Sequence, residues 1–233
     1  MKKKIVFIMN PISGTSSKAA VPSLIDSTLD KEQFEYEIKM TERPGHASEL
    51  AAEARDNHAD IVVAVGGDGT VNEVARSLVH SDSALGILPC GSGNGLARHL
   101  LLPMNLKKSI EIINACEIHD LDYGVINEYP FFCTCGMGFD AFVSMKFAES
   151  GKRGPISYAE NILREGLKYE PETYTLEDET GTKQYKAFLI SCANASQYGN
   201  NAYIAPQASM SDGLMDVVIM EPFDVIEASQ VSF

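Results

Sequence analysis

Residues 61–70 read IVVAVGGDGT, and this stretch decides the fold. Its first five residues form an unbroken apolar run, which is typical of a strand covered on both faces of a sheet. Two glycines, an aspartate and a third glycine follow, and a helical pattern begins at about Thr70. A buried strand that passes through a turn into a helix is the repeating unit of parallel α/β sheets.

The same unit recurs on both sides of this stretch. Further strands are predicted at residues 5–9, 34–40 and 85–88, and helices at about 17–29, 46–57 and 70–79. After about residue 120 the sequence changes to β segments that are joined by Gly- and Asn-rich turns. These segments lie at residues 129–136, 174–177, 186–193 and 214–220, with helices at about 140–150 and 157–168.

The fold class is therefore α/β, with two domains. Residues 1–119 are predicted to form a doubly wound parallel-sheet domain, and residues 120–233 a β-rich antiparallel domain. A new helical pattern begins at about residue 224, shortly before the sequence ends at Phe233. We therefore expect the second domain to be incomplete at its C-terminus.

Composition excludes several classes of function. The chain of 233 residues has 19 Lys and Arg against 32 Asp and Glu, so its net charge is 19 − 32 = −13. This charge argues against nucleic acid as a partner, because phosphate backbones are bound by clustered basic residues. The five cysteines form no Cys-x-x-Cys pair, and no apolar run approaches the ~20 residues that span a bilayer. We expect a cytoplasmic protein.

Three glycine-bearing turns follow three of the predicted parallel strands. We call residues 10–14 the first glycine loop, residues 66–69 the second and residues 91–95 the third. Loops at the carboxyl ends of parallel strands gather at one edge of the sheet, where ligands bind. Glycine lets a phosphate approach the backbone closely, and the N-terminus of the following helix attracts an anion. The three loops together predict a phosphate site.

Other nucleotide motifs are absent from the sequence. No Gly-x-Gly-x-x-Gly follows the first strand, and no Gly-x-x-x-x-Gly-Lys-Ser/Thr occurs. The chain also lacks His-Glu-x-x-His and Gly-x-Ser-x-Gly. A Rossmann dinucleotide site, a P-loop, a zincin and a serine hydrolase are thereby excluded.

Four motifs stand in order along the chain: Asn10-Pro11-x-Ser13-Gly14, Thr41-x-x-x-Gly45-His46-Ala47, residues 66–74 (GGDGTVNEV) and residues 91–98 (GSGNGLAR). Together with residues 212–216 (DGLMD), they resemble the diacylglycerol kinase catalytic-domain family of lipid kinases, which also includes sphingosine and ceramide kinases. The resemblance covers essentially the whole chain. It implies an N-terminal nucleotide-binding domain, a β-rich second domain, and transfer of the γ-phosphoryl group of ATP to a lipid hydroxyl with Mg²⁺.

The resemblance also implies the site residues. Those expected to contact the nucleotide are Asn10, Pro11, Ser13, Gly14, Thr41, Gly66, Gly67, Asp68, Gly69, Thr70, Val71, Asn72, Gly91 and Ser92. Asp68 is the catalytic candidate, reaching Mg²⁺ directly or through water, and its alternative role is to cap the helix at Thr70. A second metal site would use Ser209, Asp212 and the Leu214 carbonyl, and the alternative is an ordinary turn at Asp212-Gly213.

The chain departs from the family at one point. The family's proposed general base lies in an Asp-Gly-Glu/Asp motif, and no such motif follows Asp216. We therefore expect a truncated chain that binds nucleotide but phosphorylates poorly.

The acceptor stays open between diacylglycerol and a sphingoid or ceramide-type alcohol. The third loop resembles the sphingosine and ceramide kinase version, whereas Gly66-Gly67 reads as in diacylglycerol kinases. The implied partner is a lipid alcohol at the inner membrane surface, visited transiently, and a homodimer is left open. Alternative functions are an NAD kinase, whose Thr-Pro-Thr-Gly-Ser-Thr-Ala-Tyr-like segment is absent here, and a non-catalytic nucleotide- or lipid-binding regulator.

Overall fold

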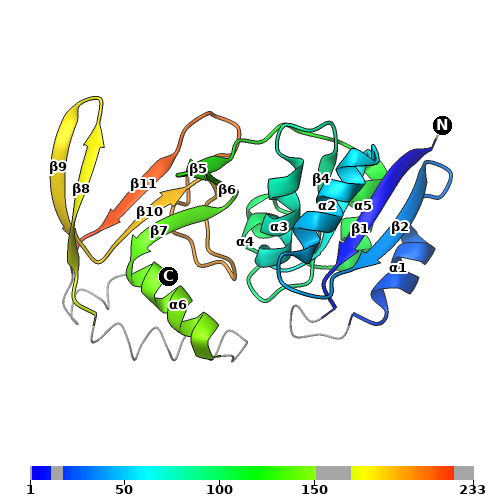
Figure 1. Ribbon diagram of the computed structural model, residues 1–233, viewed down its shortest axis with the longest axis horizontal. Helices are drawn as coiled ribbons and strands as arrows, with labels where there is room; N and C mark the ends of the chain where they lie inside the picture. The colour runs from blue at the N-terminus through cyan, green and yellow to red at the C-terminus, as the bar shows by residue number, and fades with distance from the viewer. Residues whose placement is uncertain (1, 12–17, 151–168, 223–233) are drawn as a thin grey trace. The chain divides into compact units, whose positions relative to one another are not determined.

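The computed structural model describes residues 2–11, 18–150 and 169–222 (Figure 1). The chain divides into two compact units, and the first unit consists of residues 1–132 together with Tyr198–Asn201. Residues 120–132, which the sequence analysis assigned to the second domain, lie in this first unit. They do so because the hairpin of β5 (Gly124–Ile126) and β6 (Tyr129–Phe131) contacts α3 (Asp68–Leu78).

The first unit is built on a parallel sheet, as predicted. Its strands are β1 (Lys3–Met9), β2 (Phe34–Met40), β3 (Ile61–Gly66) and β4 (Ala84–Pro89), and their order is β2-β1-β3-β4. Each neighbouring pair is parallel, and the register aligns Phe7 with Ile38 on one side and with Val63 on the other. The two central strands β1 and β3 are almost entirely buried, which explains their continuous apolar sequences.

Helices cover both faces of this sheet (Figure 1). On one face α1 (Val21–Thr28) contacts α5 (Leu106–Ala115), and on the other α2 (His46–Asp56) contacts α3. Ile25 of α1 and Ile110 of α5 are fully buried and share one core cluster with Phe7, Val63 and Val65 of the sheet. Because side chains alternate between the faces of a strand, their neighbours in β1 and β3 point toward α2 and α3.

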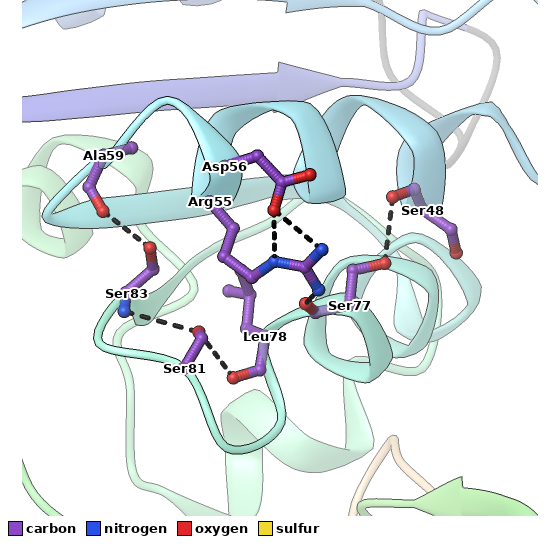
Figure 2. A network of polar contacts seen from close by, with 8 residues as sticks. All are labelled: Ser48, Arg55, Asp56, Ala59, Ser77, Leu78, Ser81 and Ser83. Carbon is purple, nitrogen blue, oxygen red and sulfur yellow. Dashed lines mark hydrogen bonds and ion pairs between the residues drawn. The ribbon is translucent and has the colours of Figure 1, made fainter.

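A polar network fixes α2 against α3 (Figure 2). The guanidinium of Arg55 bonds to Asp56 and donates to the Ser77 carbonyl at 2.7 Å, which satisfies an unpaired carbonyl in the last turn of α3. The Ser77 hydroxyl donates to the Ser48 carbonyl at 2.9 Å. The Ser81 hydroxyl closes the turn that follows α3. These contacts hold the C-terminal end of α3, whose N-terminal end carries the second glycine loop.

Several predicted boundaries differ from the structure. Helix α3 begins at Asp68 and not at Thr70, so that the aspartate lies in its first turn. Helix α1 begins at Val21, where a proline occupies the first turn, although the prediction began at residue 17. Two helices were missed: α4 (Gly95–His99), which is short, and α5, whose start is marked by Asn105. The Asn105 side chain accepts a hydrogen bond from the Lys108 N–H, which is a capping signal readable from sequence.

The second unit contains antiparallel strands, as predicted. A three-stranded sheet has the order β11 (Asp216–Met220), β10 (Leu189–Ala193), β7 (Thr134–Gly138), and β8 (Glu172–Asp178) pairs with β9 (Gly181–Ala187). Helix α6 (Phe139–Ser150) follows β7 directly, and the Phe139 and Phe188 rings pack with their centroids 4.4 Å apart. The helices predicted at about 157–168 and from about 224 lie outside the described residues.

Among the residues that the structure describes, no helix is both long enough and apolar enough to cross a membrane.

Candidate functional site

The carboxyl ends of the parallel strands bring the second and third glycine loops, together with Asn10 at the start of the first, to one edge of the sheet. The Thr41 N–H donates to the Met9 carbonyl at 2.9 Å, and the Cys90 N–H donates to the Gly66 carbonyl at 2.8 Å. These bonds continue the sheet by one residue past the strands. Four stretches of chain therefore begin side by side. They are the first loop at Asn10, the segment that starts at Thr41, and the second and third loops.

The second and third glycine loops touch through their backbones. A Cβ added at Gly67 would lie 3.0 Å from the Gly91 Cα, and a Cβ at Gly91 would overlap the Gly67 Cα. A Cβ at Gly66 would collide with the side chain of Thr70. The close approach therefore requires glycine at these positions, and it sets two loops of backbone N–H groups next to each other.

Asp68 ties these two loops together. Its carboxylate Oδ1 accepts a hydrogen bond of 2.7 Å from the Gly95 N–H, at the first residue of α4. The surrounding protein raises the pKa of Asp68 by desolvation, and backbone N–H groups of Gly95, Asn94 and Leu96 partly oppose this shift by stabilising the charged form. The residue itself is exposed to solvent. Asp68 thus links the second and third glycine loops.

The third glycine loop is closed on itself by Asn94. The Asn94 Oδ1 accepts from the Gly91 N–H at 2.8 Å, and its Nδ2 donates to the Gly91 carbonyl at 2.9 Å. Asn94 adopts φ +53°, a left-handed conformation that asparagine tolerates better than most residues. Asn94 therefore shapes the third glycine loop, a role that its place in the GSGNGLAR motif does not reveal.

A segment from much later in the chain lies against the third loop. The Gly93 carbonyl accepts from the Arg98 Nε and from the Asn200 N–H, both at 3.1 Å, and the Arg98 Nη1 donates to the Asn201 Oδ1 at 3.3 Å. A Cβ at Gly199, where φ is +114°, would lie 2.8 Å from the Gly93 Cα. We call Tyr198–Asn201 the strap; the sequence analysis had missed it.

Lys18 is a further residue that sequence reasoning missed. Its side chain is buried, with 6% exposed, and its Nζ donates to the Asn10 carbonyl at 2.6 Å. Burial lowers the pKa of Lys18, while the nearby Cys90 acts to raise it. No sequence motif marks Lys18, so its contact with Asn10 could not have been predicted from the sequence.

The predicted nucleotide contacts fall into three groups. Ser13 and Gly14 lie outside the described residues. Thr41, Gly66, Thr70 and Val71 are buried, so they would meet a ligand chiefly through backbone groups. The members that are at least partly open at the edge of the sheet are Asn10, Pro11, Gly67, Asp68, Gly69, Asn72, Gly91 and Ser92.

Glu73, which belongs to the GGDGTVNEV motif, has a structural role. Its carboxylate accepts from the N–H groups of Gly45 and Ala47, each at 3.2 Å, and so caps the N-terminus of α2. The Ser48 hydroxyl bonds to the Glu73 carbonyl at 2.8 Å. The motif therefore joins the second glycine loop to the loop that carries Thr41.

The predicted second metal site lies in a tight turn of the second unit. The Asp212 Oδ1 accepts from the Leu214 N–H at 3.0 Å, and Gly213 has φ +72°. The hydroxyls of Ser209 and Ser211 are 3.3 Å apart. These groups supply oxygen donors of the kind that Mg²⁺ prefers, with one carboxylate among them. Within the described residues, no cluster of three or more His, Cys, Asp or Glu side chains is placed to hold a metal.

Two family models match the chain. One, the diacylglycerol kinase catalytic domain, matches residues 4–126, and the other, described as the YegS C-terminal NAD kinase beta sandwich-like domain, matches residues 133–230.

Relatives and a solved structure agree with these matches. The lipid kinase YegS of Escherichia coli K12 is 28% identical over 86% of this chain and 69% of its own length. A diacylglycerol kinase of Staphylococcus saprophyticus is 27% identical over 99% of this chain and 77% of its own. A diacylglycerol kinase crystal structure from Bacillus anthracis has a TM-score of 0.74 at 19% identity, covering 98% of this chain and 79% of that chain. The structural likeness supports the two-part fold.

Proposed function

Because the chain belongs to the diacylglycerol kinase catalytic-domain family, we propose that it transfers the γ-phosphoryl group of ATP to a lipid hydroxyl. The observation that carries this proposal is the backbone contact between Gly67 and Gly91, with Asp68 bonded to Gly95 across it. Phosphoryl transfer requires positioning and charge neutralisation more than covalent chemistry. Adjoining loops of backbone N–H groups at helix N-termini supply both for phosphate oxygens.

Asp68 is the proposed catalytic carboxylate. Its Oδ1 is held by the Gly95 N–H, which fixes the carboxylate at the junction of the two loops. When bound there, Mg²⁺ would neutralise charge on the phosphates. Ser209, Asp212 and the Leu214 carbonyl would hold a second cation in the turn of the second unit, where the donor atoms fit its preference for oxygen.

The acceptor is proposed to be an alcohol of the diacylglycerol or sphingoid class, met at a membrane surface. The Staphylococcus saprophyticus relative is named a diacylglycerol kinase. The second candidate function is phosphorylation of NAD, which the description of the matched C-terminal domain as NAD kinase-like brings into consideration. Both candidates use ATP and differ in the acceptor.

A panel of acceptors with γ-labelled ATP and Mg²⁺ tests the proposal. Diacylglycerol, sphingosine, ceramide and phosphatidylglycerol would be presented in mixed micelles, with NAD as a soluble acceptor. We expect label on a lipid. Label on NAD alone would overturn the lipid proposal.

Asp68→Asn is the matched variant for this assay. The amide oxygen of asparagine can still accept from the Gly95 N–H, so we expect folding to be retained and the melting temperature not to fall. We expect the transfer rate to fall by about 100-fold or more, since the carboxylate charge is lost. Unchanged transfer in Asp68→Asn would refute the catalytic role of Asp68.

A further inference from the structure

The loop between α4 and α5 carries the most exposed large apolar residue in the described part of the chain. This residue is Leu101, which is 88% exposed. The N–H groups of Leu101 and Leu102 donate back to the carbonyls of Arg98 and Ala97, so Leu101 occupies the position after the helix that is usually glycine. Its φ is +55°. A leucine there strains the backbone and buries little apolar surface in return.

The same loop leads into two lysines that the fold does not favour either. Lys107 and Lys108 are exposed in the first turn of α5, which contains no acidic residue. The N-terminus of a helix carries partial positive charge, so lysines in this turn raise the electrostatic free energy. Neither lysine forms an ion pair with another residue that the structure describes.

Leu101 and the two lysines lie at the same end of α5. The Pro103 carbonyl accepts from the Ser109 hydroxyl at 2.6 Å, which folds the loop back onto the first turn of the helix. Leu101 is two residues before Pro103, and Lys108 directly precedes Ser109. We call Leu101, Lys107 and Lys108 the exposed triad.

The surroundings of the exposed triad are poor in acidic residues. Residues 83–110 contain no Asp or Glu, although the whole chain contains 32. Val21 and Leu106 line one pocket, so the starts of α1 and α5 lie together, and Asp26 is placed toward the other end of α1. The first acidic residue of α5 is Glu111, one turn further along the helix. The triad is therefore a locally basic surface on a chain of net charge −13.

We propose that the exposed triad docks the first unit on an anionic membrane, with Leu101 inserted among the lipids and both lysines against the headgroups. An apolar side chain next to cations is the combination that binds reversibly to such a surface. This choice of partner rests on the proposed function, whose acceptor is met at a membrane surface. The Asn94 Nδ2 contacts the Met104 Sδ at 3.8 Å, so the loop that carries Leu101 is joined to the third glycine loop. Docking here would bring that glycine loop close to the lipid.

Cosedimentation with vesicles measures the docking without ATP, Mg²⁺ or an acceptor lipid. We expect the protein to bind vesicles of equal parts phosphatidylglycerol and phosphatidylcholine, and to bind pure phosphatidylcholine about tenfold more weakly. The chain contains no tryptophan, so Leu101→Trp introduces a single fluorescent probe. Its emission should shift to the blue on the anionic vesicles and be quenched by brominated lipid. Tyr129→Trp, at a position of β6 that is 62% exposed, is the control and should show neither effect.

Leu101→Gly separates docking from folding. Glycine adopts φ +55° without strain, so we expect the melting temperature to rise while vesicle binding weakens about tenfold. The double variant Lys107→Gln/Lys108→Gln should also weaken binding about tenfold and remove most of its salt dependence. Lys183→Gln/Lys186→Gln makes the same charge change at exposed positions of β9 and should leave binding unchanged.

Three results would overturn the inference. They are absence of wild-type binding to the anionic vesicles, undiminished binding of Leu101→Gly, and equal weakening by the lysine substitutions in α5 and in β9. Dissociation of a dimer by Leu101→Gly in analytical ultracentrifugation would assign the surface to a second copy of the chain and also overturn it.

The vesicle measurements stay informative if the lipid kinase assay fails, because they involve no transfer. If the assay succeeds, docking predicts a further difference between acceptors. Leu101→Gly should phosphorylate monomeric dihexanoylglycerol at the wild-type rate and long-chain diacylglycerol in anionic vesicles about tenfold more slowly. Equal rates of the two proteins on the vesicles would overturn the docking role and leave the lipid kinase proposal standing.

Discussion

At the scale of single residues, the glycines at the sheet edge are required for different reasons. Gly67 and Gly91 are needed because two backbones touch, whereas Gly69 has open space around its Cβ position and lies in the first turn of α3. The sequence alone marked all three as phosphate-loop glycines. The sequence could not distinguish their separate roles, because the contact between Gly67 and Gly91 exists only in the folded protein, where β3 and β4 lie side by side.

This difference predicts opposite results for two alanine substitutions. Gly91→Ala places a Cβ against the Gly67 backbone, so we expect loss of stability and weakened ATP binding by at least tenfold. Gly69→Ala should preserve the fold, and its stability should rise by up to ~1 kcal/mol from the higher helix propensity of alanine. Thermal unfolding and nucleotide titration of both proteins provide the check; equal tolerance of the two substitutions would contradict the backbone contact.

Glu73 offers a second prediction at this scale. Glu73→Ala leaves the N–H groups of Gly45 and Ala47 without their carboxylate cap, and we expect a loss of about 1 kcal/mol in the free energy of unfolding. Glu49→Ala is the matched control on α2, because the Arg43–Glu49 pair lies on the surface with both side chains more than half exposed. Denaturant titration should show a smaller effect for Glu49→Ala, and the reverse order would refute the capping role.

At the scale of elements, the strands were easier to predict than the short helices. Strand β2 was predicted with its observed bounds because the alternation of residues 34–40 is regular. Helix α4 has only five residues, which is too short for a helical periodicity to show in the sequence. Its start is held by the Asp68 carboxylate, which is distant in sequence. The segment at 186–193 was predicted as one strand and is two, β9 and β10, because the chain leaves one sheet for another at Phe188.

The pairing of β7 with β10 carries a pH prediction. Cys135 lies opposite Cys192 across the two strands, and burial together with this neighbouring thiol raises the pKa of Cys135 to about 11, from an ordinary value of 9.0. The folded protein thus holds this proton more tightly than the unfolded chain does. Its contribution to stability is complete below about pH 9 and is lost as the pH rises toward 11.

Unfolding at pH 8.0, 9.5 and 10.5 tests this expectation. The stability of the wild-type protein should decline across the series more steeply than that of Cys135→Ala, which lacks the group. The comparison between the two proteins is needed because burial also raises the pKa of Tyr169, whose ionisation adds to the decline at higher pH. Parallel declines would show that Cys135 makes no contribution.

At the scale of the whole molecule, composition predicts how salt affects stability. The described ion pairs each include a partner whose side chain is more than half exposed, so they add little to offset the repulsion of a −13 chain. Salt screens this repulsion, because the Debye length shortens to about 10 Å at 0.1 M. We expect the melting temperature to rise between ~0.02 and ~0.2 M NaCl, in thermal scans at pH 7.5. A falling melting temperature would show that attractive pairs dominate instead.

The sequence predicted the division into a parallel and an antiparallel half, because each half repeats its own pattern over many residues. It could not predict that Tyr198–Asn201 lies with the first unit. That placement depends on Gly93 and Gly199, two positions 106 residues apart (199 − 93), and on two asparagines with positive φ. Contacts between backbone segments that are far apart in the sequence produce no periodic pattern of residues in either segment.

The strap also bears on how genes of this family can recombine. An exchange of coding sequence after residue 132 would appear to trade one unit for another, yet it would import a foreign strap into the native third glycine loop. The hybrid would inherit a mismatch at Gly93 and Arg98 unless residues 198–201 came from the same parent as residues 91–98. The strap and the third glycine loop would therefore have to be inherited together, although their coding sequences lie far apart in the gene.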